Sequence, residues 1–292
     1  MREQSALRPR AVRGGRGHDR GVSEEPFYRP LAADPADPAA GLFHATAATT
    51  GPWFADAQHL GPPSALLVRA FERVPPSRPD APPLQLARYT IEILGAVPAG
   101  EVAVKAWVER PGRTIELLAA EMSASGRVVL RARAWRLAVG DTADATSGAA
   151  EPIPGPDTVE PQVGRPAGWL PGYLDAVDWR WVAGRFDELG PGAAWGRLRV
   201  PVVEGEEPSD LQRLAAVADS ANGVAAPLPM SGWLFLNTEL SVHLHRPPTG
   251  EWTGIDASTV VGPTGTGTVS GLLFDADGHA GRITQELTVR RR

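Results

Sequence analysis

The segment LGAVPAGE (94–101) has a counterpart 150 residues later, LHRPPTGE (244–251), in which Leu, Pro, Gly and Glu stand at the same places. The offset still holds at Gly112, and after a two-residue insertion Gly126 matches Gly278. An ungapped match of this kind indicates an internal repeat. Coincidence is the alternative, because the chain is rich in Gly and Pro.

Each copy of the repeat follows an apolar helix and lies among predicted strands. Residues 64–71 (SALLVRAF) and 214–218 (LAAVA) are apolar on almost all sides, which is typical of buried helices. Proline is tolerated in the first turn of the first helix, and Ser209 and Asp210 supply capping groups for the second. Alternating apolar residues and turn dipeptides predict strands at 84–94, 101–110, 113–123, 127–137, 233–244, 251–261, 266–275 and 280–290.

The plan of helix followed by strands predicts an α+β fold built from two tandem units. In each unit a curved antiparallel sheet can wrap one long helix, and the units can join edge to edge and so cover their exposed strands. Residues 139–168 are dominated by Pro, Gly, Ala and acidic residues and are predicted to form a linker. Residues 1–24 have no hydrophobic period and are predicted to be a disordered basic tail. The expected domains are 25–138 and 169–292.

Composition excludes several classes of site. Cysteine is absent, which excludes disulfides, thiolate nucleophiles and cysteine-based zinc sites. The six His residues contain no HExxH motif, so no metal or other cofactor is expected. The net charge of −5 disfavours nucleic acid as a partner. No apolar run is long enough to span a membrane and no secretory signal is recognisable, so a cytoplasmic location is expected.

Polar side chains occupy positions of the second half where apolar ones are expected. Gln285 falls on the core face of the last strand, and a buried amide without partners costs about 1–3 kcal/mol. Asp219 lies on the Ala-rich face of the second helix, where a carboxylate is rare unless it is paired or functional. The residue of the first half that matches Asp219 at the 150-residue offset is Arg69.

These polar residues can be assembled into a water-activating site. Asn237 and Thr238 stand early in the strand predicted at 233–244, so a carboxylate, an amide or hydroxyl, and a second amide come from three elements. Together they could hold and activate one water molecule. The alternative is that Asp219 and Gln285 only bond backbone groups. His59, in the loop before the first helix, could contact a ligand, although loop histidines commonly have no such role.

Three motifs resemble a known family. The segment WLFLNTELSVHLHRPPTGEW (233–252), with QELTVR (285–290), resembles the second half of the acyl-CoA thioesterase II group. QHLGPP (58–63), the helix after it and ERPGR (109–113) resemble the first hotdog unit of thioesterase-like proteins in the same superfamily. The resemblance covers about 27–138 and 169–291. It implies a double hotdog fold, in which each of two tandem units has a long helix wrapped by a curved antiparallel sheet.

The resemblance also implies a reaction, the hydrolysis of a fatty acyl-CoA or related acyl thioester by direct attack of water. The catalytic Asp and Gln of the family match Asp219 and Gln285. The position of the family's Thr holds Asn237 here, with Thr238 beside it, so either side chain could fill the third place. Asp219 would be the general base.

Substrate contacts are expected near the start of the first helix. His59 and Gly61 would bind the substrate there, since backbone N–H groups at a helix N-terminus can stabilise an oxyanion. No cofactor is implied, the expected partner is acyl-CoA, and a homo-oligomer is compatible with the fold. One alternative is a hotdog dehydratase acting on 3-hydroxyacyl thioesters, for which His59 paired with an acid would be needed. The other is a hotdog protein that binds acyl thioesters without catalysis.

Overall fold

The computed structural model describes residues 25–34 and 36–292; the tail predicted at 1–24 lies outside the described residues. The strands are β1 (Tyr28–Asp34), β2 (Asp37–Ala45), β3 (Leu84–Ile93), β4 (Gly100–Arg110), β5 (Ile115–Ala124), β6 (Arg127–Ala138), β7 (Val177–Ala183), β8 (Gly192–Leu198), β9 (Trp233–Asn237), β10 (Glu239–Leu244), β11 (Trp252–Val261), β12 (Thr266–Asp275) and β13 (Gly278–Arg291). The helices are α1 (Gly61–Arg73), α2 (Asp210–Ala218) and α3 (Ala221–Val224). Short 3-10 turns are η1 (Ala47–Thr49), η2 (Ala143–Ala145), η3 (Pro156–Thr158) and η4 (Tyr173–Asp175).

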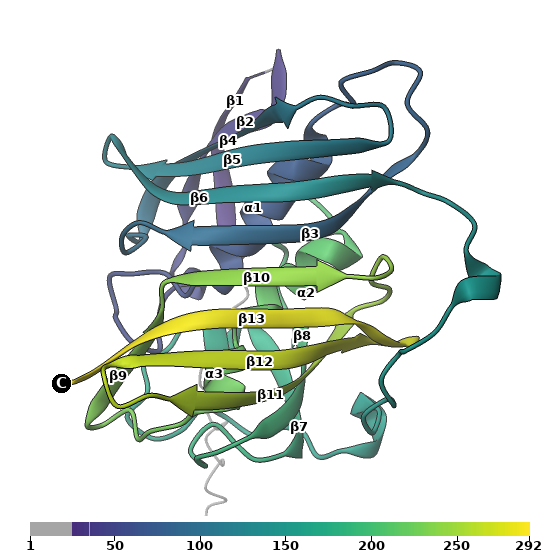
Figure 1. Ribbon diagram of the computed structural model, residues 1–292. Helices are drawn as coiled ribbons and strands as arrows, with labels where there is room; N and C mark the ends of the chain where they lie inside the picture. Colours follow the sequence, from purple (N-terminus) through teal and green to yellow (C-terminus); the bar gives the residue numbers. More distant parts are fainter. Residues whose placement is uncertain (1–24, 35) are drawn as a thin grey trace, which may run out of the picture.

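The strands form one continuous antiparallel sheet in the order β1-β2-β4-β5-β6-β3-β10-β13-β12-β11-β8-β7, with β9 also paired to β13 (Figure 1). The two halves of the chain meet where β3 pairs with β10. The predicted strands are confirmed, mostly to within two residues at their ends. The exception is 233–244, which breaks at Thr238 into two strands that pair with different parts of β13. The hairpins β1-β2 and β7-β8, which the strand pattern did not predict, extend the sheet at its two ends.

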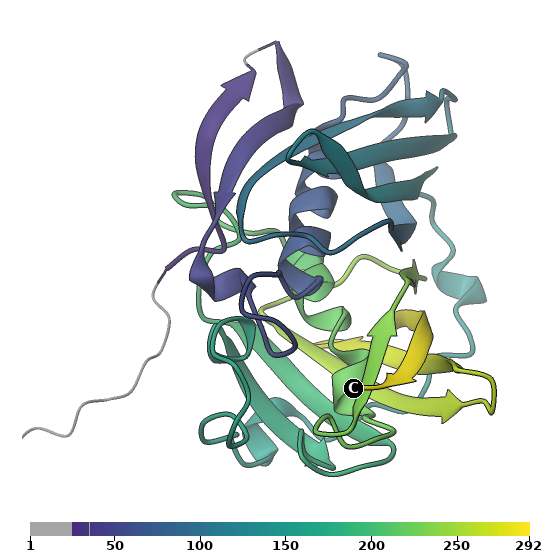
Figure 2. The same cartoon turned by 90° about the vertical axis from the view of Figure 1, so that its left-hand side faces the viewer.

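The helices are buried behind this sheet. Gly61–Phe71 of α1 are all buried, and the helix packs against α2 and against strands β2, β4 and β5. Figure 2 shows α1 and α2 in the middle of the molecule, between the central strands of the sheet and the β1-β2 hairpin at one of its ends. The prediction that both apolar helices are buried is therefore confirmed. In the described part of the chain, no helix is long and apolar enough to cross a membrane.

The second helix, α2, ends one residue before Asp219. Ser209 caps its start by accepting a hydrogen bond from the backbone N–H of Gln212 (3.1 Å). Its regular part stops at Ala218, and Asp219 follows as the C-cap residue. The end of α2 therefore fixes where the Asp219 side chain leaves the backbone.

Candidate active site

Asp219 is the centre of a buried polar cluster. Its side chain is 4% exposed, and Oδ1 accepts hydrogen bonds from Nδ2 of Asn237 (2.8 Å) and Nε2 of Gln285 (3.1 Å). Burial raises the pKa of Asp219 to about 7, while hydrogen bonds from Asn237, Gln285 and the backbone N–H groups of Gly61 and Leu60 oppose the rise. A carboxyl group with a pKa near neutrality can exchange a proton at neutral pH, as a general base must.

Gln285 fixes the position of Asp219 through hydrogen bonds to both its side chain and its backbone. Its Nε2 also donates to the backbone oxygen of Asp219 (3.0 Å), and its Oε1 accepts from the backbone N–H of Asn222 (3.1 Å). Both amide hydrogens are thus used within the protein, which satisfies a side chain that is 1% exposed. Gln285 therefore orients the end of α2 and has no hydrogen left to donate to a water molecule.

The strand break at residue 238 separates the two candidates for the third position. Asn237 is the last residue of β9 and turns its amide toward Asp219. The Thr238 side chain is exposed, and its hydroxyl donates to the backbone oxygen of Glu286 (3.3 Å). The structure thus brings Asn237 to Asp219 and places Thr238 outside the cluster.

His59 reaches the cluster from the first half of the chain. Its Nδ1 lies 3.1 Å from Oδ2 of Asp219, and its ring stacks on Tyr173 with a centroid separation of 3.9 Å and an interplanar angle of 7°. The hydroxyl of Tyr173 donates to the backbone oxygen of Ala216 (2.8 Å), which anchors the stack to α2. Sequence reasoning missed Tyr173, because nothing in its local pattern distinguishes it from a core aromatic residue.

The low pKa of His59 determines where the protons lie in its contact with Asp219. Burial lowers the pKa of His59 to about 3, so the ring is neutral at neutral pH and carries one N–H. When Asp219 is ionised, that proton can stand on Nδ1 and be donated to Oδ2, and the backbone N–H of Gly61 then bonds to Asp219 alone. When Asp219 is protonated, the carboxyl donates to Nδ1 and the ring proton belongs on Nε2. Ionisation of Asp219 and the tautomer of His59 are therefore coupled.

Gly61 allows the two helices to meet at this cluster. A Cβ atom at Gly61 would lie 2.2 Å from the backbone oxygen of Ala216, so no larger residue fits. Its backbone N–H lies 3.1 Å from Nδ1 of His59 and also bonds to Asp219. The positive end of the α1 dipole thus faces the carboxylate and favours its charged form.

A cavity of about 190 Å³ opens in front of the cluster. Asp219 and Asn237 line it from the second half, and His59, Trp53 and Ile93 line it from the first. A smaller hollow of about 20 Å³ shares Trp53, His59 and Asn222 with it and is otherwise walled largely by apolar residues, including Trp169, Leu174, Phe186, Met230 and Phe235. The reactive groups therefore stand between an opening and an apolar recess. Sequence reasoning missed Trp53, whose role depends on a loop conformation.

Arg69, which stands in the first half 150 positions before Asp219, forms an ion pair with Glu206 of the second half. Arg69 is 7% exposed, and its Nε and Nη2 donate to the two carboxylate oxygens of Glu206, both at 2.6 Å. Arg73 donates to Glu206 as well (2.8 Å). The repeat therefore supplies a neutralised pair where the second half has a lone buried acid.

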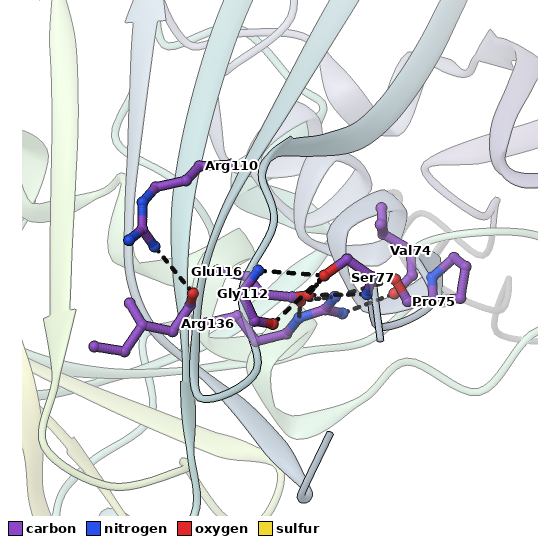
Figure 3. A network of polar contacts seen from close by, with 8 residues as sticks. Val74, Pro75, Ser77, Arg110, Gly112, Glu116 and Arg136 are labelled. Carbon is purple, nitrogen blue, oxygen red and sulfur yellow. Dashed lines mark hydrogen bonds and ion pairs between the residues drawn. The ribbon is translucent and has the colours of Figure 1, made fainter. Parts of the chain in front are cut away.

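A second buried polar cluster lies near the C-terminal end of α1 (Figure 3). Glu116, 0% exposed, accepts from Nε of Arg136 (2.9 Å) and from the backbone N–H of Ser77 (2.8 Å). Arg136 also donates to the backbone oxygen of Val74 (2.7 Å). Against the effect of burial, hydrogen bonds from Ser77 and Arg136 hold the pKa of Glu116 below its ordinary value. Because this carboxylate is ionised and fully engaged, the cluster is structural.

A larger depression of about 460 Å³ lies on the outer face of the sheet, over the first half. It is lined by exposed charged groups such as Glu109 and Arg133, which pair with each other (2.8 Å). It contains no buried acid or base and is not a second candidate active site. Within residues 25–34 and 36–292, no three His, Asp or Glu side chains are arranged to hold a metal ion.

Comparison with known proteins gives one family for both halves. The family described as acyl-CoA thioesterase N-terminal domain matches residues 49–137, and the one described as acyl-CoA thioesterase C-terminal domain matches residues 155–289. No curated protein was found to match the chain.

Solved structures share the fold at low sequence identity. A conserved protein of unknown function with a hot dog fold from Alicyclobacillus acidocaldarius is 18% identical, with 86% of this chain and 93% of that chain covered and a TM-score of 0.66. An acyl-CoA thioesterase II from Mycobacterium marinum is 16% identical, with coverage of 86% and 93% and a TM-score of 0.60. A tesB protein from Mycobacterium avium is 13% identical, with coverage of 86% and 92% and a TM-score of 0.61. These similarities establish a hotdog fold.

Proposed function

The chain belongs to the acyl-CoA thioesterase family, and from this premise we propose that it hydrolyses an acyl-CoA to a free acid and coenzyme A by direct attack of water. The observation that carries the proposal is Asp219, a buried carboxyl with a pKa of about 7 at the wall of a cavity. We propose further that the fold is a double hotdog, in which α1 and α2 are the helices that the sheet wraps.

In the proposed reaction, Asp219 is the general base. It removes a proton from a water molecule in the cavity while the water oxygen attacks the carbonyl carbon of the thioester. The carbon–sulfur bond then breaks, and the thiolate of coenzyme A leaves and takes up the proton. Gln285 is a positioning residue, because its amide hydrogens are both bonded to Asp219.

His59 offers a second route for the same proton. If Nε2 of His59 accepts the proton of the water, the proton on Nδ1 can pass to Oδ2 of Asp219, 3.1 Å away. Both groups then end neutral, and no imidazolium forms. This suits a ring whose pKa is held at about 3 by burial.

We assign to Asn237 the stabilisation of the negative charge that develops on the carbonyl oxygen of the thioester. One hydrogen of its Nδ2 is donated to Asp219, and the described residues supply no acceptor for the other, while the side chain lines the cavity. An amide hydrogen held in this way can stabilise the charge that forms on the thioester oxygen. The N–H of Gly61, which was expected to do this, is already bonded to Asp219.

Two arginine side chains favour a substrate that carries phosphate groups. Arg291 lies over the ring of Trp233 (4.5 Å) and Arg292 over the ring of Trp53 (5.9 Å), which lines the cavity, and neither forms an ion pair within the described residues. Along β13, Arg291 is six residues from Gln285, roughly 20 Å. The pantetheine arm of coenzyme A has a length equivalent to about four extended residues, roughly 15 Å. The remaining distance of roughly 5 Å is within the length of an extended arginine side chain, so the diphosphate could meet these guanidinium groups.

A colorimetric thiol assay with a series of acyl-CoA chain lengths tests the proposal. We expect coenzyme A release by the unchanged protein, a loss of at least 100-fold in Asp219→Asn, and a change of less than twofold in the neighbouring control Thr238→Ala. No release with any chain length, or full activity in Asp219→Asn, would contradict it.

A second function is favoured by one observation, the 3.1 Å contact between His59 and Asp219. A His paired with an acid is what a hotdog dehydratase acting on 3-hydroxyacyl thioesters would need. The same protein preparation separates the two: an enoyl-CoA that gains water while no thiol is released indicates the dehydratase. Saturable binding of acyl-CoA with neither reaction indicates a non-catalytic binding protein.

A further inference from the structure

The hollow of about 20 Å³ lies at the inner end of the candidate active site. His59 and Asn222 line both the hollow and the larger cavity, so a chain attached to a carbonyl group beside Asp219 can enter the hollow past them. The larger cavity reaches exposed side chains such as Phe54, which is 42% exposed. The wall of the hollow is mostly buried and apolar, with Leu174, Phe186, Ala226 and Phe235 among its residues.

The hollow is very small. A cavity needs about 10–15 Å³ to accept one water molecule, so about 20 Å³ accepts one or two groups of that size. A methyl or methylene group is similar in size to a water molecule. If the carbonyl carbon of an acyl chain lies in the larger cavity, there is room for about one to three further carbons.

Phe186 closes the hollow and is held by three tryptophan rings. It stands in the loop between β7 and β8 and is 4% exposed. Its ring meets those of Trp181 and Trp179 edge-on, with centroid separations of 4.9 and 5.1 Å, and that of Trp169 at 5.8 Å. Trp179 and Trp181 are themselves buried. Aromatic pairs of this geometry are favourable and protein interiors are close-packed, so Phe186 cannot leave the wall without displacing one of these rings.

Trp169 forms a second part of the wall, and hydrogen bonds hold its loop in place. Nε of Arg165 donates to the backbone oxygen of Trp169 (2.9 Å), and Nη1 of Arg165 forms an ion pair with Asp175 (2.6 Å). The backbone N–H of Trp169 donates to the backbone oxygen of Pro166 (3.2 Å). The protein therefore fixes the position of this indole without the help of a ligand.

At β8, no acyl channel runs between the helices and the sheet. A Cβ atom at Gly196 would lie 2.7 Å from Cγ1 of Val217 on α2, and one at Gly192 would lie 2.2 Å from the backbone oxygen of Val224 on α3. Both glycines belong to β8, so this strand and the two helices touch with no room for even a methyl group. A long acyl chain cannot pass between them.

On the basis of the proposed hydrolysis of acyl-CoA, we propose that the acyl group of the substrate is short, with about two to four carbons, and that Phe186 and Trp169 set this limit. A longer chain would have to displace a ring from the wall or bend back into the larger cavity, where the pantetheine arm also has to fit. One methylene group too many or too few in an apolar pocket changes kcat/KM by about 10- to 200-fold. Medium- and long-chain acyl-CoA should therefore be poor substrates.

Hydrolysis of straight-chain acyl-CoA from acetyl to dodecanoyl tests the limit. For the unchanged protein we expect the highest kcat/KM between acetyl-CoA and butanoyl-CoA, and a value at least 100-fold lower for octanoyl-CoA. Phe186→Ala removes the phenyl ring from the wall and should raise kcat/KM for octanoyl-CoA relative to butanoyl-CoA at least tenfold. Trp169→Leu, a change at a half-buried residue of another loop, should act in the same direction and serves if Phe186→Ala does not fold.

Phe274→Ala is the matched control for the loss of a buried phenyl ring. Phe274 is 1% exposed, packs on His279 and lines neither the hollow nor the larger cavity. Its replacement should lower the stability of the protein, as Phe186→Ala does, and leave the order of preference among chain lengths unchanged.

Calorimetric titration of Asp219→Asn with the same acyl-CoA series separates the limit from catalysis. Butanoyl-CoA should bind more tightly than coenzyme A itself, and octanoyl-CoA should not. If no acyl-CoA is hydrolysed but binding shows this limit, the proposed reaction fails and the assignment of the pocket stands. Three results would overturn the short-chain limit: octanoyl-CoA hydrolysed or bound as well as butanoyl-CoA, an unchanged preference in both wall variants, or no binding of any acyl-CoA.

Discussion

Replacing Asp219 by Asn should change how the stability of the protein depends on pH. The ordinary pKa of the carboxyl is 3.8, and burial raises it to about 7 in the folded protein. A difference of about three units corresponds to about 4 kcal/mol between the charged and neutral forms, at about 1.4 kcal/mol per unit. Asn has nearly the same shape and does not titrate, so this contribution is absent from the variant.

The sign of this pH dependence is set by whether the folded or the unfolded protein binds the proton of Asp219 more tightly. Because the folded protein has the higher pKa, the stabilising contribution of Asp219 is complete below pH 3.8 and is lost as the pH rises through about 7. Between pH 5 and pH 9, proton linkage with these two pKa values gives a loss of about 2–3 kcal/mol. The free energy of unfolding of Asp219→Asn, measured relative to the unchanged protein, should therefore rise by that amount over the same range.

Urea unfolding of both proteins at pH 5, 7 and 9 measures this difference. Other groups, including His59, titrate in both proteins and largely cancel. Asp256→Asn, a change at an exposed carboxyl on β11, serves as the control for the loss of a carboxyl group outside the cluster. The activity of the unchanged protein should rise through pH 7 as the base loses its proton. A pH-independent difference between Asp219→Asn and the unchanged protein would refute the assignment of Asp219 as a buried carboxyl with a raised pKa.

Further outcomes follow from individual contacts. Asn237→Ala should lower kcat 10- to 100-fold and shift the pH–rate midpoint upward, because the buried carboxylate loses a hydrogen-bond donor; stopped assays from pH 5 to 9 measure both. Removing the side chain of both Arg291 and Arg292 should raise KM for acyl-CoA at least fivefold and leave hydrolysis of the phosphate-free acyl-pantetheine unchanged. Glu116→Ala should destabilise the protein by about 3 kcal/mol in urea unfolding, since it leaves the guanidinium of Arg136 buried without its partner, while kcat is retained.

The fold was predictable to the extent that local patterns determine it. Period-two alternation located the long strands, and apolar character on all sides identified α1 and α2 as buried. The β1-β2 hairpin was not predicted, because its sequence, with Pro, Asp and Ala, has little strand character. The hairpin is stabilised by the pairing of β2 with β4. The break at Thr238 escaped for a similar reason, since β9 and β10 pair with different parts of β13. Long-range pairing, which no local pattern contains, decides both.

The candidate site was predictable where burial and polarity conflict. Asp219 and Gln285 stand at apolar positions of a helix and a strand, and that conflict made them visible. The choice between Asn237 and Thr238 stayed open, because it depends on the break between β9 and β10. The sequence pattern predicts one unbroken strand there. His59 carried no such conflict, and its contact with Asp219 joins residues that are 160 positions apart. Residues that matter through tertiary contact alone leave no trace in the local pattern.

The difference between the two halves explains why the site needs both of them. At positions 150 residues apart, Arg69 is neutralised by Glu206, whereas Asp219 has no cationic partner among the residues that the structure describes and depends on hydrogen bonds for its position. Those bonds come from β9 and β13 of its own half and from the start of α1 in the other. A relative shift of the halves would therefore separate the carboxylate from its donors while leaving either core intact. The β3–β10 pairing and the Arg69–Glu206 contact both join the halves, so they hold the geometry on which a lone buried acid depends.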